Sequence, residues 1–113
     1  MTPIATATNT PGPPIPVGSG PWAFAITPDG KTAYVINFYS HSVTPIATAT
    51  STAGAPIEVG EGARAIVITP DGQTAYIGVW GEPGTVVPIA TATNTPGQPI
   101  GVGDGPYAIA ITP

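Results

Sequence analysis

Positive charge is almost absent from this chain. Lys31 and Arg64 are the only basic residues, against six acidic ones, and the formal net charge is -4. Nucleic-acid affinity depends mainly on Lys and Arg side chains that neutralise phosphates. Two basic residues neutralise too few of them, so no nucleic-acid partner is expected.

Cysteine is missing, and no long apolar run occurs. Without Cys the chain has no disulfide and no thiolate metal site, although its compartment stays open. No run approaches the ~18 apolar residues of a membrane-spanning helix, so membrane insertion is not expected. The N-terminus has no basic segment followed by an apolar one, and therefore no visible signal peptide.

Gly and Pro, in contrast, are abundant, with 15 and 16 copies among 113 residues. This share approaches the range of low-complexity disorder. Disordered chains, however, combine high charge with low hydrophobicity, whereas 7% of these residues are charged and 42% are hydrophobic. Together with the repeat described next, this balance favours a folded chain.

The chain is built on an internal repeat. The hexapeptide Pro-Ile-Ala-Thr-Ala-Thr begins at Pro3, again 42 residues later at Pro45, and 43 residues after that at Pro88. Such a period fits either helical HEAT or armadillo units or a four-stranded propeller blade. Apolar residues nowhere recur with helical spacing over ten residues, and Gly or Pro interrupts the chain too often for helices.

Short segments rich in β-branched and aromatic residues indicate strands instead. In the first complete repeat they are residues 22–27, 32–37, 43–50 and 56–59. The Thr-Pro-Asp-Gly segments at 27–30 and 69–72 predict tight hairpins between the first two strands of a repeat. Pro45 and Pro88 fall in the third strand, where Pro cannot donate to a ladder, and a bulge is expected there.

The predicted fold is therefore all-β, a β-propeller segment of four-stranded antiparallel blades. Residues 1–20 form the third and fourth strands of a partial blade, 21–60 a first full blade, 61–104 a second, and 105–113 the first strand of a further blade. Propellers close with four to eight blades, so we expect a fragment of a longer array with open, association-prone edges.

These motifs resemble the YVTN-type β-propeller repeat of bacterial and archaeal surface or secreted proteins. The resemblance rests on Pro21 with its following strand, Pro-Asp-Gly at 28–30 and 70–72, Tyr-Val-Ile-Asn at 34–37, and Tyr76-Ile77. It implies a scaffold or binding module, secreted or on the cell surface, without a reaction or a cofactor of its own. Ala5, Ala47 and Ala90 depart from the pattern, because many such repeats carry Asp there.

The least repetitive residues are expected on one face, around the central channel. The same repeat position holds Trp22, Arg64 and Tyr107, and nearby loops supply the other candidates, Asn37, Tyr39, Trp80 and Glu82, with Phe38 and His41 beside them. Aromatic and Arg side chains that converge in this way are typical of a binding surface. Alternatively, Trp22 and Tyr107 only cap the core between blades.

The remaining polar residues suggest no catalytic or metal site. His41 is interpreted as a solvated turn residue, and Asp29 and Asp71 are explained by turn chemistry. We therefore expect a non-catalytic scaffold or a protein- or ligand-binding module, whose partner is a protein or another copy of the chain. The alternatives are a fragment of a propeller enzyme, lactonase-like or similar, and a structural repeat that self-assembles into a ring.

Overall fold

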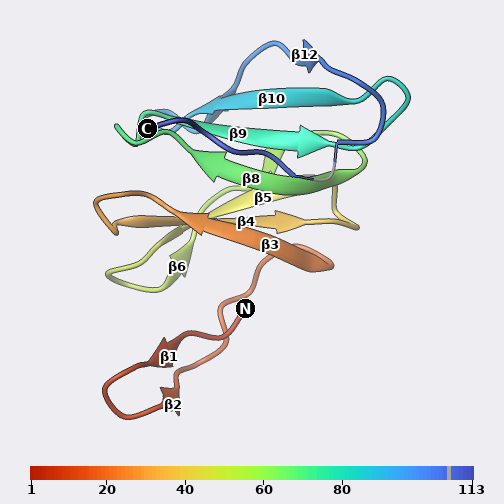
Figure 1. The fold of residues 1–113 in the computed structure, drawn as a ribbon. Coiled ribbons are helices and arrows are strands. Elements are labelled where there is room, and N and C mark those ends of the chain that lie inside the picture. Colours follow the sequence, from red (N-terminus) through yellow and green to blue (C-terminus); the bar gives the residue numbers. More distant parts are fainter. Residues whose placement is uncertain (107) are drawn as a thin grey trace.

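The computed structural model describes residues 1–106 and 108–113, and Tyr107 lies outside the described residues. Strands and turns make up the described part of the chain, which contains no helix that could cross a membrane. Two antiparallel five-stranded sheets pack against each other, and a small hairpin of β1 (Ile4–Ala5) and β2 (Thr10–Pro11) lies at one end of the molecule (Figure 1). The predicted fold class, a β-propeller segment with antiparallel blades, is confirmed.

Each sheet is a meander in which the outermost strand is split in two. The first sheet contains β3 (Pro21–Ile26), β4 (Thr32–Asn37), β5 (Ser42–Ala47), β6 (Thr52–Ala53) and β7 (Ile57–Glu58). The second contains β8 (Ala63–Ile68), β9 (Thr74–Val79), β10 (Thr85–Ala90), β11 (Thr95–Pro96) and β12 (Ile100–Gly101). We call these two sheets blade 1 and blade 2. The described residues of 105–113 form no strand, so the first strand expected there stays a prediction.

The split in the outer strand explains how Pro is tolerated inside a central strand. Pro45 stays in continuous register with Tyr34 of β4, so the bulge expected in this strand is wrong. The Pro45 carbonyl accepts a 2.7 Å hydrogen bond from the Gly54 amide, and the Pro45 nitrogen faces the same edge. That edge faces the interruption between β6 and β7, where no partner requires an N–H. Pro88 and Gly97 repeat the arrangement, also at 2.7 Å.

Glycine recurs opposite each of these prolines because the two residues are in contact. A Cβ atom added at Gly54 would lie 3.2 Å from Pro45 Cγ, and one at Gly97 would lie 3.1 Å from Pro88 Cγ. Both distances are shorter than ordinary van der Waals contacts. The repeated Pro and Gly therefore form a matched pair that shapes the gap in the outer strand.

The Thr-Pro-Asp-Gly hairpins are held by side chains as well as by the backbone. Asp29 Oδ1 accepts hydrogen bonds from the Thr27 hydroxyl at 2.6 Å and from the Lys31 amide at 2.9 Å. Asp71 makes the same two bonds in blade 2, at 2.6 and 3.0 Å. The Thr hydroxyl, above all, lowers the pKa of each Asp below its usual 3.8, because these bonds favour the carboxylate. The sequence prediction of two equivalent tight turns is confirmed.

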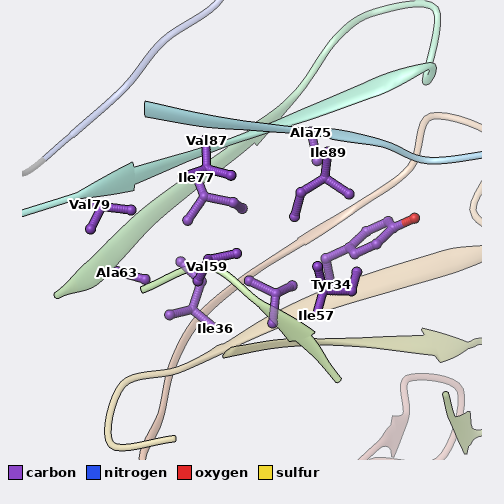
Figure 2. Packing of buried hydrophobic residues seen from close by; sticks show 11 residues of the cluster. Tyr34, Ile36, Ile57, Val59, Ala63, Ala75, Ile77, Val79, Val87 and Ile89 are labelled. Atoms are coloured by element: carbon purple, nitrogen blue, oxygen red, sulfur yellow. The ribbon is translucent and has the colours of Figure 1, made fainter. Parts of the chain in front are cut away.

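The main core lies between the two blades (Figure 2). Tyr34 and Ile36 extend from β4 towards Ala75, Ile77 and Val79 of β9 within one buried cluster. The other face of β4 packs into a second cluster, where Ala33 and Val35 meet residues of the N-terminal segment. Strand β4 is therefore buried on both faces, as a strand inside a stack of blades must be.

Truncation of a side chain in this interblade core should be costly. Ile77 is fully buried, and we expect Ile77→Ala to lower the free energy of unfolding by about 2–5 kcal/mol, because it loses apolar burial and leaves a cavity. The matched control is Ile100→Ala, since Ile100 is 48% exposed; its effect should stay within about 0.5 kcal/mol. Urea denaturation of both variants measures the difference, and equal effects would contradict the assigned core.

The turn carboxylates provide a prediction about pH. Thr69→Ala should raise the pKa of Asp71 back towards 3.8, because the hydroxyl that stabilises the carboxylate is removed. The folded pKa of Asp71 lies below its unfolded value, so its contribution to stability is present above about pH 3.8 and is lost as the pH falls through the folded pKa. As the pH falls below about 3.8, the variant should therefore lose less stability than the unchanged chain does. Carboxyl NMR titration measures both groups, and Asp29, with Thr27 intact, is the internal control.

Candidate functional site

Two of the predicted site residues are placed by the same backbone irregularity. In β3 the pairing with β4 shifts between Pro21 and Ala23, which leaves Trp22 as the extra residue of a bulge. In β8 the pairing with β9 shifts between Ala63 and Ala65, which leaves Arg64 in the equivalent place. Bulges re-aim a side chain out of the alternation of a strand. A position that differs between the repeats is thus the bulged position of the first strand.

Arg64 lies among three aromatic rings. Its guanidinium carbon is 5.2 Å from the centre of Phe38, 5.7 Å from Trp80 and 5.9 Å from Trp22. These distances are within the range of cation–π attraction. Trp22 and Phe38 also contact each other, with ring centres 5.6 Å apart. We call Trp22, Phe38, Arg64 and Trp80 the Arg64 cluster; it joins blade 1 to blade 2.

The loops that carry these rings are fixed by glycine. The amide of Phe38 donates to the Gly20 carbonyl at 2.8 Å, and the amide of Trp80 donates to the Gly62 carbonyl at the same distance. Gly62 has φ +98° and a side chain there would meet the Trp80 carbonyl oxygen, so only Gly allows this close approach. The Gly-x-Gly connections that precede the two blades, residues 18–20 and 60–62, therefore also position the aromatic residues.

The cluster is accessible at the surface. Trp22 is 62% exposed and Trp80 is 38% exposed, whereas Phe38 and Arg64 are half-buried beneath them. Tyr39, 72% exposed, extends the aromatic surface by packing edge-on against Phe38, with ring centres 5.3 Å apart. A half-buried cation with exposed aromatic walls can bind an apolar or aromatic group together with a carboxylate.

The other predicted site residues lie elsewhere. Asn37 is fully buried, donates to Thr44 Oγ1 at 2.7 Å and lies against Gly18, so it takes no part in this surface. Glu82 is exposed in the loop between β9 and β10. Tyr107 falls outside the described residues. No three His, Cys, Asp or Glu side chains gather as a metal site anywhere in 1–106 and 108–113.

Phe38 is the contributor that sequence reasoning undervalued. The sequence puts Phe38 only beside the candidate residues, whereas its ring is the nearest of the three to the Arg64 guanidinium. The available signal was its repeat position. Phe38 and Trp80 both follow directly after the second strand of their blades, 42 residues apart, so two aromatic residues occupy equivalent places.

The opposite end of the interblade boundary carries a separate polar cavity of about 290 Å³, lined by residues that include Asp29, Asp71 and Thr91. Tyr34 also borders this cavity and donates from its hydroxyl to Asn94 Oδ1 of blade 2 at 2.6 Å. Burial raises the pKa of the Tyr34 phenol. Oδ1 of each Asp accepts two turn hydrogen bonds, and the Tyr34–Asn94 bond joins the two blades beside this cavity.

Antiparallel sheets stacked through shared apolar faces, with bulged inner strands and Gly-x-Gly connections, define a segment of a β-propeller. No protein-family model and no curated sequence matches the chain. Among solved structures, hydrazine synthase of Kuenenia stuttgartiensis is similar over 86% of this chain, with a TM-score of 0.79 and 29% identity. A functionally unknown protein of Desulfotomaculum acetoxidans is similar over 99%, with a TM-score of 0.85 and 24% identity.

A third similar structure, the dihydro-heme d1 dehydrogenase NirN, covers 91% of the chain with a TM-score of 0.78 and 16% identity. The chain spans only 28%, 36% and 23% of these three proteins, in the order given. At these levels of identity the likeness supports the propeller fold, which the sheets of this chain share.

The contribution of Arg64 to the blade contact can be measured. Arg64→Met retains much of the side-chain length but removes the charge, and we expect it to lower the free energy of unfolding by about 1–2 kcal/mol, because cation–π attraction is lost. Lys31→Met is the matched control, since Lys31 is exposed. Urea denaturation followed by tryptophan fluorescence measures the free energy of unfolding of both variants. An unchanged value for Arg64→Met would show that the cation adds nothing to the stability of the blade contact.

Proposed function

We propose that the chain is a non-catalytic propeller segment that acts as a binding scaffold, and that the Arg64 cluster is its docking surface for a protein segment. The observation that supports this most is the guanidinium within 6 Å of three ring centres at an accessible surface. Trp, Tyr and Arg are the residues that most often dominate binding energy at protein interfaces.

The electrostatic setting favours one kind of partner segment. Arg64 is one of two basic residues in a chain of net charge -4. A polyanion would be repelled by the surrounding charge, whereas a single carboxylate can pair with the guanidinium. We therefore propose a partner segment in which one Asp or Glu stands beside an aromatic or large apolar residue that stacks on Trp22 or Trp80.

A binding role accords with the chemistry of the cluster better than catalysis does. Arg, Trp and Phe supply no general base and no activated nucleophile.

We also propose membership in the YVTN-type repeat family. The paired Pro-Asp-Gly hairpins and the second strands that carry Tyr34 and Tyr76 support it.

The test uses a phage-displayed library of random peptides selected on the purified chain. Selected peptides should combine an acidic residue with an aromatic one, and Arg64→Met or Trp22→Ala should weaken their binding about 30-fold, the equivalent of a 2 kcal/mol interface residue. Ile100→Ala serves as the control for an exposed apolar residue elsewhere. If the cluster variants bind the selected peptides as tightly as the unchanged chain does, the docking surface is not here.

A further inference from the structure

Blade 1 has polar side chains at buried positions that are apolar in blade 2. Asn37, the last residue of β4, and Thr44, the third residue of β5, are both buried. The same places in blade 2 hold Val79 and Val87, which are buried as well. A blade of this repeat therefore folds with apolar residues there. Because the burial of polar atoms opposes folding, the polar pair in blade 1 points to a role other than stability.

The side-chain amide of Asn37 is only partly satisfied. Its Nδ2 atom donates to Thr44 Oγ1 at 2.7 Å and to Ser42 Oγ at 3.3 Å. Its Oδ1 atom is buried and accepts no hydrogen bond from residues 1–106 and 108–113. The two hydroxyls accept from Asn37, so their own protons remain available to a third group. Buried polar groups without a partner are uncommon in proteins, and departures of this kind occur at functional sites.

The two hydroxyls line a cavity of about 300 Å³ on blade 1. This volume is at the lower end of the range of small-molecule sites, roughly 300–1,000 Å³. Four polar side chains contribute to the lining, those of Ser40, Ser42, Thr44 and Glu58. Pro16, Val17 and Pro56 supply apolar surface. We call this space the blade 1 cavity.

Asn37 lies directly behind the wall of the blade 1 cavity. Gly18 also lines this cavity, and a Cβ atom added there would be 2.8 Å from Asn37 Cγ. A side chain at residue 18 would therefore displace the amide. The amide thus contacts three lining residues and holds two of them, Ser42 and Thr44, by hydrogen bonds. Asn37 positions these hydroxyls from outside the cavity.

The lining offers both donors and an acceptor to a ligand. Ser40 Oγ accepts the Ser19 amide at 2.6 Å, so its proton remains available. The protons of Ser42 and Thr44 remain available in the same way. The carboxylate of Glu58 supplies an acceptor, and Glu58 is the residue opposite Ser42 in the pairing of β5 with β7.

A neutral sugar satisfies this set better than a charged ligand does. An anion is repelled by Glu58, the one charged side chain among the described residues of the lining. An ammonium group has no acceptor for the hydroxyl protons. A sugar hydroxyl both donates and accepts, and the C–H face of a sugar ring can pack on apolar surface such as that of Val17 and Pro56.

We propose that the blade 1 cavity binds a neutral hexose. The hydroxyls of Ser42 and Thr44 donate to sugar oxygens, and the Glu58 carboxylate accepts from a sugar hydroxyl. Asn37 is a positioning residue that holds the first two hydroxyls. The cavity has no residue in common with the Arg64 cluster, so the sugar is a second ligand beside the proposed partner segment.

The direct test titrates the isotope-labelled chain with D-glucose, D-galactose and D-mannose and follows the amide NMR spectrum. We expect at least one of these sugars to cause saturable shifts at the amides of Ser42, Thr44 and Glu58. The corresponding uronate replaces the hydroxymethyl group of the same ring by a carboxylate, and it should bind at least tenfold more weakly because Glu58 repels it. If no sugar gives saturable shifts, or if the shifts lie away from the cavity, the inference is wrong.

A single substitution in the chain tests the hydroxyl of Thr44. Thr44→Val copies the residue of blade 2 and removes the hydroxyl at nearly unchanged volume. It should weaken sugar binding at least tenfold, because a sugar oxygen loses its donor. Thr10→Val is the matched control, since Thr10 is exposed on β2 and lies outside the cavity. Equal sugar affinities for Thr44→Val and the unchanged chain would contradict the proposal.

A second measurement separates a role in binding from a role in folding. The double variant of Asn37→Val and Thr44→Val gives blade 1 the residues of blade 2 and removes the buried Oδ1 atom that lacks a partner. It should melt at least about 3 °C higher than the unchanged chain and should no longer bind the sugar. A lower melting temperature would show that the polar residues serve the fold, and this result would overturn the inference.

Discussion

The structure depends on the double-sided burial of the second strand of each blade. Strand β4 places Tyr34 and Ile36 towards blade 2 and Ala33 and Val35 towards the N-terminal segment, all of them buried. A strand with apolar side chains on both faces cannot be satisfied by one sheet, because one face would remain in water. Each blade therefore requires a neighbour on both sides, and the stacking of blades follows from this requirement.

The same constraint unites the two surfaces of interest. Where neighbours are in place, at the boundary of blades 1 and 2, the bulged residues and the loops gather into the Arg64 cluster. At the outer face of β3, Phe24 and Ile26 are exposed. Both lie on β3, which contributes Trp22 to the first and Phe24 to the second.

Much of this architecture could be predicted from the sequence, because the residues that form the turns and strands recur in each copy of the repeat. The hairpins at Pro28 and Pro70 and the strand at residues 32–37 are fixed by local residue chemistry, and they occur where predicted. The split of the outer strand could not be predicted, because it arises from contact between Pro45 and Gly54 across two strands. The bulges at Trp22 and Arg64 could not be predicted either, because each is defined by the register of its strand on the neighbouring strand.

The candidate site was predictable in part for a similar reason. Divergence between the repeat copies predicts Trp22, Arg64 and Trp80, and the structure brings these three together. The same criterion also selects Asn37. Its side chain is buried and donates a hydrogen bond to Thr44 on the neighbouring strand β5. Variation between copies identifies a region of the surface, whereas burial within that region is decided by packing.

The two sheets stack as propeller blades through a shared core. The most direct measurement is a set of NMR nuclear Overhauser contacts across the boundary, from the Tyr34 ring to Asn94 and from the Ile36 methyls to those of Ile77. The stacked blades predict cross-peaks for both pairs, since Tyr34 and Asn94 are hydrogen-bonded at 2.6 Å and the two Ile residues share one buried cluster. Strong contacts within each sheet with none between them would contradict the account.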